Sequence, residues 1–359
     1  MTAFLEVIQP GAYTTVQDRG RFGYQRFGVP PVGMLDARAG EIAGMLVGNR
    51  GGEAVLEFTF FGATLEVLAE GTIALTGAEM PLTINGAARA SWRAHAVSPG
   101  DTVVVGQAEG GCRGYLAVSG GIDVPEVMGS RSTYVGAGIG GHEGRALEAG
   151  DILRRGALPG DGAEKGRARK LPAAFKPRYG GTIELRAVRG PQDDFFDEGL
   201  RRFFESTYTV TPQANRMGYR LDGEAVVQRE GMPKSIISEP SLPGGVQIPE
   251  DGQPIVLLVE QTVGGYTKVA TVISADLPKV AQAVPGDEVR FREVGIEEAH
   301  EIHRRERERM ERLREAILSG EVPWAGLGGE GGEDRGVFCP KIFTGEMLFD
   351  VLNRELLQI

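Results

Sequence analysis

Short apolar stretches separated by glycine dominate the first part of the chain and predict strands. The helical spacing of three and four residues occurs between Met34 and Val47, so we expect a helix there, with Asp36 capping its start. Residues 1–156 are therefore predicted to form a β-rich domain with one helix. The predicted strands are Val55–Phe60, Thr64–Leu68, Thr72–Thr76, Thr102–Gly106 and Gly114–Ser119, all rich in β-branched residues.

A change of pattern follows at residues 157–180, which lack apolar periodicity and are rich in proline, glycine and basic residues. That composition is typical of a linker. Residues 181–296 return to the strand pattern and form the second predicted domain. Its clearest strand is Ile255–Val259, a continuous apolar run of the kind found in strands buried on both faces, as in a closed barrel.

The last part of the chain, residues 297–359, is predicted to be a helical C-terminal extension. A charged helix begins at Ile296, and its pairs Glu301–Arg305 and Glu308–Arg312 have the favourable i,i+4 order. Its apolar stripe is thin, so we interpret it as an interaction element that needs a partner surface. A second amphipathic helix is predicted at Glu346–Leu357.

Glycine is the unusual feature of the composition, with 54 residues in 359, about twice the average usage. The glycines follow no collagen-like period, so they indicate many tight turns and short strands. A Gly-Asp pair precedes an apolar strand at Gly100-Asp101, Gly150-Asp151 and Gly286-Asp287. Glycine can take positive φ there and aspartate can bond its own turn, so each pair predicts a strand-initiating turn.

Charge and cysteine content narrow the class of protein. The net charge is −10 and no basic patch with interleaved aromatic residues occurs, which argues against nucleic acid as a partner. Two distant cysteines, Cys112 and Cys339, give neither a metal motif nor a disulfide framework. No signal peptide and no membrane-spanning apolar segment are expected, and we predict a cytoplasmic protein.

Two polar, glycine-rich segments of the first domain are candidate binding loops. Asp18 and Arg19 are adjacent, so one can face a site while the other makes a structural ion pair; the alternative is a turn held by Asp18. The second segment, 129–133, contains Arg131 and Ser132 and can cradle a phosphate or carboxylate through backbone N–H groups and a guanidinium. A mobile loop is its alternative interpretation.

A third segment combines an amide, guanidinium groups and a phenol within six residues, 215–220. Asn215, Arg216 and Tyr219 suit the binding of a planar polar group or a carboxylate. The alternative is an exposed turn before a strand.

The fourth segment, 238–271, is the strongest candidate because the buried strand Ile255–Val259 leads directly into polar residues. Glu239 can move protons if desolvated, Gln247 and Gln261 offer donors and acceptors, and Lys268 can neutralise an anion. These four are the predicted catalytic residues. The predicted binding residues are Asp18, Arg19, Arg131, Ser132, Asn215, Arg216, Tyr219, Thr262, Gly264, Gly265 and Tyr266. No nucleophilic triad, metal motif or biotin-acceptor Met-Lys-Met occurs, so biotin is not expected to be attached to this chain.

These stretches together resemble the allophanate hydrolase subunit 2 family, which includes the PxpC proteins of 5-oxoprolinase, the KipA proteins and half of the carboxyltransferase domain of urea carboxylase. The resemblance runs from the start of the chain to about Phe291. It is carried by Thr15–Gly20, Val47–Asn49 with Leu56-Glu57, Ala74–Ala78, Tyr115–Pro125, Gly129–Thr133, Gly141–Arg145, Asn215–Arg220, Val246–Pro254 and Gly264–Leu277.

The resemblance implies a mainly β fold, with a β-rich N-terminal domain, a cyclophilin-like β-barrel domain and few helices. It implies a subunit-1 partner (PxpB- or KipI-like) and a third, LamB/YcsF-like partner. With them, the chain is expected to act as the C subunit (PxpC) of an ATP-dependent 5-oxoprolinase, which converts 5-oxoproline to glutamate, and ATP is expected to act through the complex. The chain alone is expected to be inactive.

Two other functions remain open for such a family member. One is a biotin-dependent carboxyltransferase that acts on a small amide or ureido substrate, and the other is a KipA-like, non-enzymatic antagonist of a kinase inhibitor. The chain departs from the family pattern after the buried strand, where Glu260 directly precedes Gln261 and Thr267 stands in place of proline.

Overall fold

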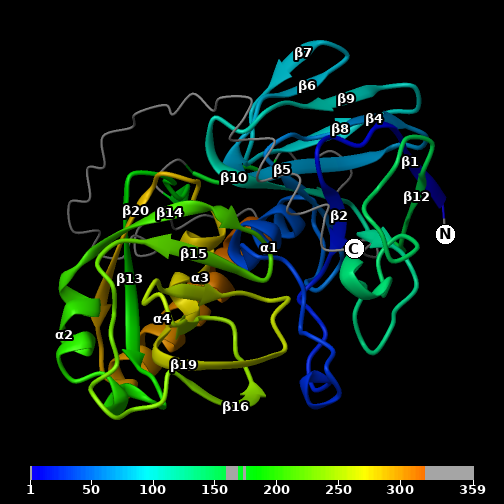
Figure 1. Cartoon of the computed structure of the whole chain (residues 1–359). Coiled ribbons are helices and arrows are strands. Elements are labelled where there is room, and N and C mark those ends of the chain that lie inside the picture. The colour runs from blue at the N-terminus through cyan, green and yellow to red at the C-terminus, as the bar shows by residue number, and fades with distance from the viewer. Residues whose placement is uncertain (1, 159–168, 173–174, 320–359) are drawn as a thin grey trace.

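The computed structural model describes residues 2–158, 169–172 and 175–319, and its fold is mostly β as predicted (Figure 1). The helix predicted after Met34 is α1, and Asp36 caps it by accepting a hydrogen bond from the Ala39 N–H at 2.9 Å. In the described ranges, no helix is long and apolar enough to cross a membrane. The α-helices are α1 (Ala37–Leu46), α2 (Glu198–Glu205), α3 (Leu277–Ala281) and α4 (Ile296–Ser319).

Two β-sheets form the N-terminal half, and one apolar core is shared between them. Alternate residues of each strand face this core, which is why short glycine-bounded strands suffice to build it. The first sheet has the order β11 (Ile122–Asp123), β12 (Ile152–Arg155), β1 (Thr2–Gln9), β4 (Thr64–Val67), β9 (Thr102–Val105), β6 (Leu82–Ile84) and β7 (Ala87–Arg89). The second has the order β2 (Thr14–Gln17), β3 (Val55–Thr59), β10 (Gly110–Val118), β5 (Gly71–Glu79) and β8 (Ala94–Val97).

The C-terminal half is a β-barrel that closes where β13 pairs with β19. The predicted buried strand is β18 and is shorter than expected, because the chain turns after Leu257. One strand, β16, lies outside the closed ring and pairs with β19 along one edge. The sheet order is β13 (Thr182–Arg189), β20 (Glu288–Glu293), β14 (Thr207–Ala214), β15 (Gly218–Asp222), β18 (Ile255–Leu257), β17 (Gly245–Ile248), β19 (Val263–Val272) and β16 (Ser235–Pro240).

The predicted Gly-Asp turns are confirmed at all three positions. Gly100, Gly150 and Gly286 have φ of 86°, 93° and 87°, and each following aspartate accepts a hydrogen bond from the backbone N–H three residues before it. The same local geometry therefore starts β9, β12 and β20.

Asp151 gives one of these turns a pH-dependent contribution to stability. Its carboxylate accepts two hydrogen bonds from Arg145, at 2.8 and 2.9 Å, and one from the Glu148 N–H. The Arg145 guanidinium, with smaller contributions from that N–H and His142, lowers the pKa of Asp151 to about 2. The unfolded value is about 3.9, so the stabilisation is complete above that pH and is lost as pH falls toward 2.

We therefore expect Asp151→Asn to lower the free energy of unfolding by about 2 kcal/mol at pH 7. Urea unfolding of both proteins between pH 7 and pH 2 checks this. The difference between them should shrink below about pH 4. A difference that stays constant across that range would contradict the assignment.

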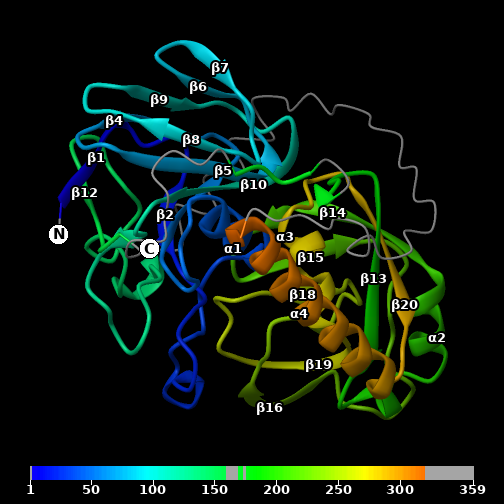
Figure 2. The same ribbon diagram turned by 180° about the vertical axis from the view of Figure 1, so that it is seen from behind.

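Helix α4 corrects our interpretation of the thin apolar stripe. Its C-terminal part does not need a second molecule, because Leu313 and Ile317 are buried against α1 residues such as Ile42. Figure 2 shows α4 running from the barrel to α1. The predicted pairs Glu301–Arg305 and Glu308–Arg312 are present at 2.8 and 3.2 Å. The helix predicted at Glu346–Leu357 lies outside the described residues.

The described parts of segment 157–180 contact the N-terminal half. Lys170 pairs with Arg93 in an isolated β-bridge, and Leu171 and Phe175 are buried in the same apolar cluster as α1. Tyr179 donates a hydrogen bond to the Asp36 carboxylate at 2.8 Å.

Candidate functional site

A buried ion cluster joins the two halves of the molecule at Arg216, which lies between β14 and β15. Its guanidinium donates to the carboxylates of Glu57 on β3 and Glu260 after β18, and to the Gly33 carbonyl at 2.8 Å. Arg216 and Glu57 are almost completely buried, and Glu260 is nearly so. Burial alone lowers the pKa of Arg216, but the two carboxylates outweigh it and hold that pKa above its usual range.

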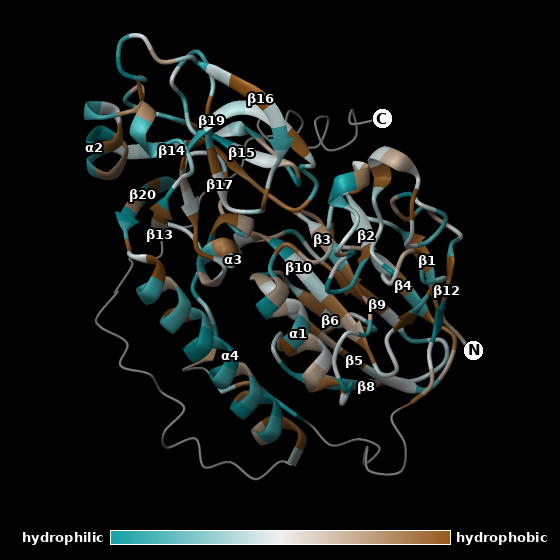
Figure 3. Ribbon diagram, turned by 90° about the horizontal axis from the view of Figure 1, so that it is seen from below, coloured by the Kyte–Doolittle hydropathy of each residue, from teal (hydrophilic) through white to brown (hydrophobic). Residues whose placement is uncertain are grey.

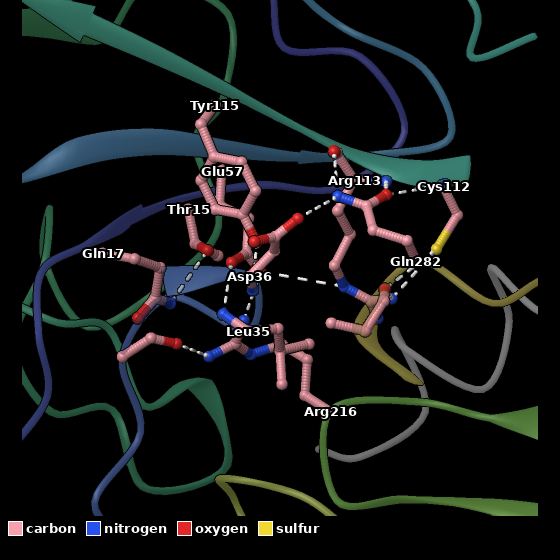
Figure 4. Close-up of polar contacts among 12 residues, drawn as sticks. Thr15, Gln17, Leu35, Asp36, Glu57, Cys112, Arg113, Tyr115, Arg216 and Gln282 are labelled. Atoms are coloured by element: carbon pink, nitrogen blue, oxygen red, sulfur yellow. Dashed lines mark hydrogen bonds and ion pairs between the residues drawn. The ribbon is translucent and has the colours of Figure 1, made fainter. Parts of the chain in front are cut away.

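Gln282 forms a second link between the halves, beside the first (Figure 4). Its amide oxygen accepts hydrogen bonds from the N–H groups of Cys112 and Arg113, and its nitrogen donates to Asp36 and to the Arg113 carbonyl. Burial raises the pKa of Asp36, while the hydrogen bonds from Gln282 and Tyr179 act in the opposite direction. Arg113 in turn donates to the Tyr219 hydroxyl at 2.5 Å and to the Ala281 carbonyl at 2.8 Å.

We call Glu57, Arg216, Glu260, Asp36, Arg113, Tyr219 and Gln282 the interface cluster. Its polar groups bond to one another and are buried, so a ligand could reach them only by displacing these contacts. Arg216 and Tyr219, predicted from the sequence as binding residues, therefore hold the halves together. Asn215 has a local role: its side-chain oxygen accepts hydrogen bonds from the N–H groups of Met217 and Gly218, which shapes the turn.

Asp18 is the centre of a buried hydrogen-bond network in the N-terminal half. Its carboxylate accepts from the Ser130 and Ser132 hydroxyls, both at 2.6 Å, and from the Arg131 N–H. This supports the interpretation of Asp18 as the residue that holds a turn, and Arg19 makes the structural ion pair with Glu41 at 2.9 Å.

In the predicted anion cradle at 129–133, four of the backbone N–H groups already have hydrogen-bond partners. The N–H groups of Ser130, Arg131, Ser132 and Thr133 already donate to Val127, Asp18, the Ser130 hydroxyl and Val16. The Arg131 side chain lies elsewhere, paired with Glu126 at 3.3 Å. It lines an open cavity of about 660 Å³ together with Arg155, Glu53 and Asp123.

A different arrangement occurs on the outer wall of the barrel, under β16. Val246 and Ile248 face the barrel core, so Gln247 between them faces outward. Lys268 lies opposite Gln247 in the β17–β19 ladder and therefore shares its face. Both side chains are buried, and the Lys268 ammonium pairs with the half-exposed Glu239 carboxylate at 2.5 Å. This ion pair is the main cause that lowers the pKa of Glu239.

Gln247 has an unused donor at this place. Its side-chain nitrogen is buried and makes no hydrogen bond within the described ranges. Gly264 makes room for it, since a Cβ at that position would lie 2.3 Å from the nitrogen. Gly264 stands opposite Glu239 in the β16–β19 ladder, so Glu239, Gln247, Gly264 and Lys268 meet in one place, which we call the wall site.

The remaining predicted residues of this segment surround the wall site without joining its polar contacts. The Gln261 amide donates to the Val263 carbonyl at 2.6 Å, and the Thr262 carbonyl accepts from the Ser241 N–H. Gly265 packs against the Ile236 carbonyl, and Tyr266 is 43% exposed.

Sequence reasoning missed Gln192, which follows β13 and contacts the wall site. Its side-chain oxygen accepts a hydrogen bond from the Lys268 N–H at 3.0 Å. Nothing in the local sequence indicates this contact, because Lys268 lies 76 residues away along the chain. Glu57 was detectable, since an acidic residue inside an apolar strand must be paired to be buried.

The chain thus combines a two-sheet unit with a closed barrel, and the buried interface cluster lies between them. The family model for the carboxyltransferase domain, subdomains A and B, matches residues 27–293, and the chain belongs to this family.

Two related proteins and one solved structure show how similar the chain is to known proteins. The chain is 40% identical over 298 residues to the C subunit of 5-oxoprolinase from Escherichia coli (strain K12), covering 82% of this chain and 93% of that protein. It is 33% identical over 333 residues to urea amidolyase of Lachancea kluyveri, covering 87% of this chain but 18% of the much longer relative. The crystal structure of the Kluyveromyces lactis urea carboxylase superposes with a TM-score of 0.81 at 31% identity, covering 95% of this chain and 31% of that one.

Proposed function

We propose that this chain is the C subunit (PxpC) of an ATP-dependent 5-oxoprolinase-type amidohydrolase, which converts 5-oxoproline to glutamate and is inactive without its partners. The observation that carries the proposal is the similarity to the Escherichia coli 5-oxoprolinase protein, which extends over 93% of that relative. The urea amidolyase relatives, in contrast, are matched over only a small part of their length.

The wall site supplies the chemistry that we assign to this chain. Lys268 provides a buried positive charge, and Gln247 provides a buried N–H donor with no partner in the described ranges. In our proposal these two groups bind the lactam carbonyl oxygen or the carboxylate of 5-oxoproline and stabilise the negative charge that develops when the amide is attacked. Glu239 forms an ion pair with Lys268 and is the group placed to exchange a proton.

ATP is assigned to the partner proteins. The N–H groups of residues 130–133 are already bonded within the chain, which argues against a phosphate there, and the described residues contain no cluster suited to a metal ion. We propose a subunit-1 protein (PxpB- or KipI-like) and a LamB/YcsF-like protein as partners. Exposed apolar side chains beside the wall site support a covering partner: Ile237 on β16 is 93% exposed and Leu242 is 64% exposed. Part of the β16 ribbon has the brown colour of hydrophobic residues in Figure 3.

Reconstitution tests the proposal. The chain is mixed with both partner proteins, ATP and 5-oxoproline, and glutamate is measured against mixtures that lack one component. We expect glutamate from the complete mixture and none from this chain alone. A complex that assembles and forms no glutamate would refute the function.

A second candidate is a carboxyltransferase that passes a carboxyl group from carboxybiotin on a separate carrier to a small amide or ureido acceptor. The family model and the urea carboxylase superposition favour it. The same complex, given carboxybiotin and urea in place of ATP and 5-oxoproline, decides between the two. Carboxyl transfer without glutamate formation would select this candidate.

A further inference from the structure

The open cavity of about 660 Å³ that Arg131 lines belongs to the N-terminal half, whereas the wall site belongs to the barrel. Arg155, the last residue of β12, lines the same cavity. In the sheet, Arg155 stands opposite Thr2 of β1 and opposite Ile122 of β11, so strands on both sides hold its backbone. Figure 1 shows β1 and β12 side by side near the N-terminus. We call this hollow the edge cavity.

The Arg155 side chain lies on the core face of its sheet. Leu153, two residues earlier on the same strand, is a member of the apolar core, and alternate residues of a strand share a face. The Arg155 guanidinium carbon lies 5.2 Å from the centre of the Phe4 ring. Gly71 leaves space for it, because a Cβ at that position would lie 3.2 Å from the Arg155 Nη1. The guanidinium is therefore held in place by packing.

No carboxylate neutralises this guanidinium within the part of the chain that the structure describes. The Arg155 Nη1 is buried and makes no hydrogen bond in those ranges. Burial lowers the pKa of Arg155, yet a guanidinium stays charged at neutral pH. A buried donor of a charged group is costly when it has no acceptor. An anion in the edge cavity would supply the negative charge that Arg155 lacks.

Arg131 offers a second guanidinium to the same cavity. Its backbone is fixed, because its N–H donates to the buried Asp18 carboxylate. Its side chain pairs with Glu126 at 3.3 Å, and the two side chains are 34% and 53% exposed. An exposed pair of this kind contributes little to stability, so Arg131 can exchange Glu126 for an anion at low cost.

The other walls of the edge cavity restrict the kind of anion. Two acidic residues, Glu53 and Asp123, also line it, and they disfavour a doubly charged ligand such as phosphate. Both oxygens of the Glu53 carboxylate already accept backbone N–H groups, and Asp123 stands opposite Arg154 in the β11–β12 ladder. Apolar side chains complete the lining: Ala54, Ile122, Ala157 and Leu158. These walls suit a singly charged ligand with a short apolar tail.

We propose that the edge cavity is a binding site for a short-chain aliphatic carboxylate, with Arg155 and Arg131 as the partners of its carboxylate group. A guanidinium matches a carboxylate because its planar fork can donate two parallel hydrogen bonds. The site is independent of the proposed function, since it uses no residue of the wall site. Binding therefore needs neither ATP nor a partner protein.

Calorimetric titration of the full chain with valerate tests the proposal, and valeramide is the neutral ligand of the same shape. Wild type should bind valerate more tightly than valeramide. Arg155→Met keeps an apolar contact with Phe4 but removes the charge, so it should weaken valerate binding about tenfold or more. The matched control is Arg154→Met, because Arg154 is exposed on the opposite face of β12. It should bind valerate as wild type does.

A second measurement keeps the test decisive if Arg155→Met does not fold. Nitrogen-15 NMR of the wild-type chain should show the Arg155 Nε–H signal shifting with valerate and not with valeramide, with that signal assigned through its absence in Arg155→Lys. Equal affinity of wild type for the two ligands, or an unmoved Nε–H signal, would overturn the site. Equal losses in Arg155→Met and Arg154→Met would also overturn it. Tighter binding of inorganic phosphate than of valerate would refute the assignment to carboxylates.

Discussion

Replacing Arg216 with methionine is expected to lower the free energy of unfolding by about 3–5 kcal/mol. The guanidinium is the shared partner of Glu57 and Glu260, and all three side chains are buried. Its removal leaves two carboxylates without a cation in a place that water does not reach. The cost of those uncompensated charges greatly exceeds the packing that the methionine side chain retains.

Urea unfolding of Arg216→Met measures the loss, and Arg220→Met is the matched control. Arg220 lies four residues away and pairs with Asp251 at 2.7 Å, but its side chain is 31% exposed and that of Asp251 is 50% exposed. A pair of this kind contributes less than about 1 kcal/mol. The triple variant Arg216→Met, Glu57→Gln, Glu260→Gln should recover part of the loss. If Arg216→Met and Arg220→Met lowered the free energy of unfolding equally, the interface cluster would not hold the halves together.

Local features of this fold could be predicted from the sequence because their causes are local. The cap of α1 by Asp36 and the three Gly-Asp turns depend on contacts within three residues. The mainly β fold followed from glycine-bounded apolar stretches, and its closed barrel was expected from one strand with two buried faces and from the family resemblance.

The role of Arg216 could not be predicted because its partners are distant in sequence. Glu57 and Gly33 lie 159 and 183 residues away along the chain. A run of amide, guanidinium and phenol groups predicts polar chemistry, but the pattern does not say whether those groups face a ligand or each other. Arg216 and Tyr219 belong to the buried interface cluster, whereas Gln247 and Lys268 belong to the wall site.

Substitution of Lys268 with methionine is expected to reduce glutamate formation by about 10²- to 10³-fold in the reconstituted complex. That is the usual cost of losing a preorganised donor that stabilises developing negative charge in a water-poor site. Lys268 has this character because its ammonium is buried and its one ion-pair partner within the described ranges is the half-exposed Glu239. Stability should change much less, since the methionine keeps most of the packing and Glu239 remains in contact with water.

Glutamate formation by complexes that contain wild type, Lys268→Met or Lys234→Met tests the central claim most directly. Lys234 is the matched control because it is an exposed lysine directly before β16, the strand that carries Glu239, and it has its own ion pair to Glu250. Because the wall site is the functional centre in this account, we expect turnover near the wild-type value for Lys234→Met. For Lys268→Met we expect turnover to fall by about 10²-fold or more at an equal folded fraction. Equal turnover for the two variants would contradict it.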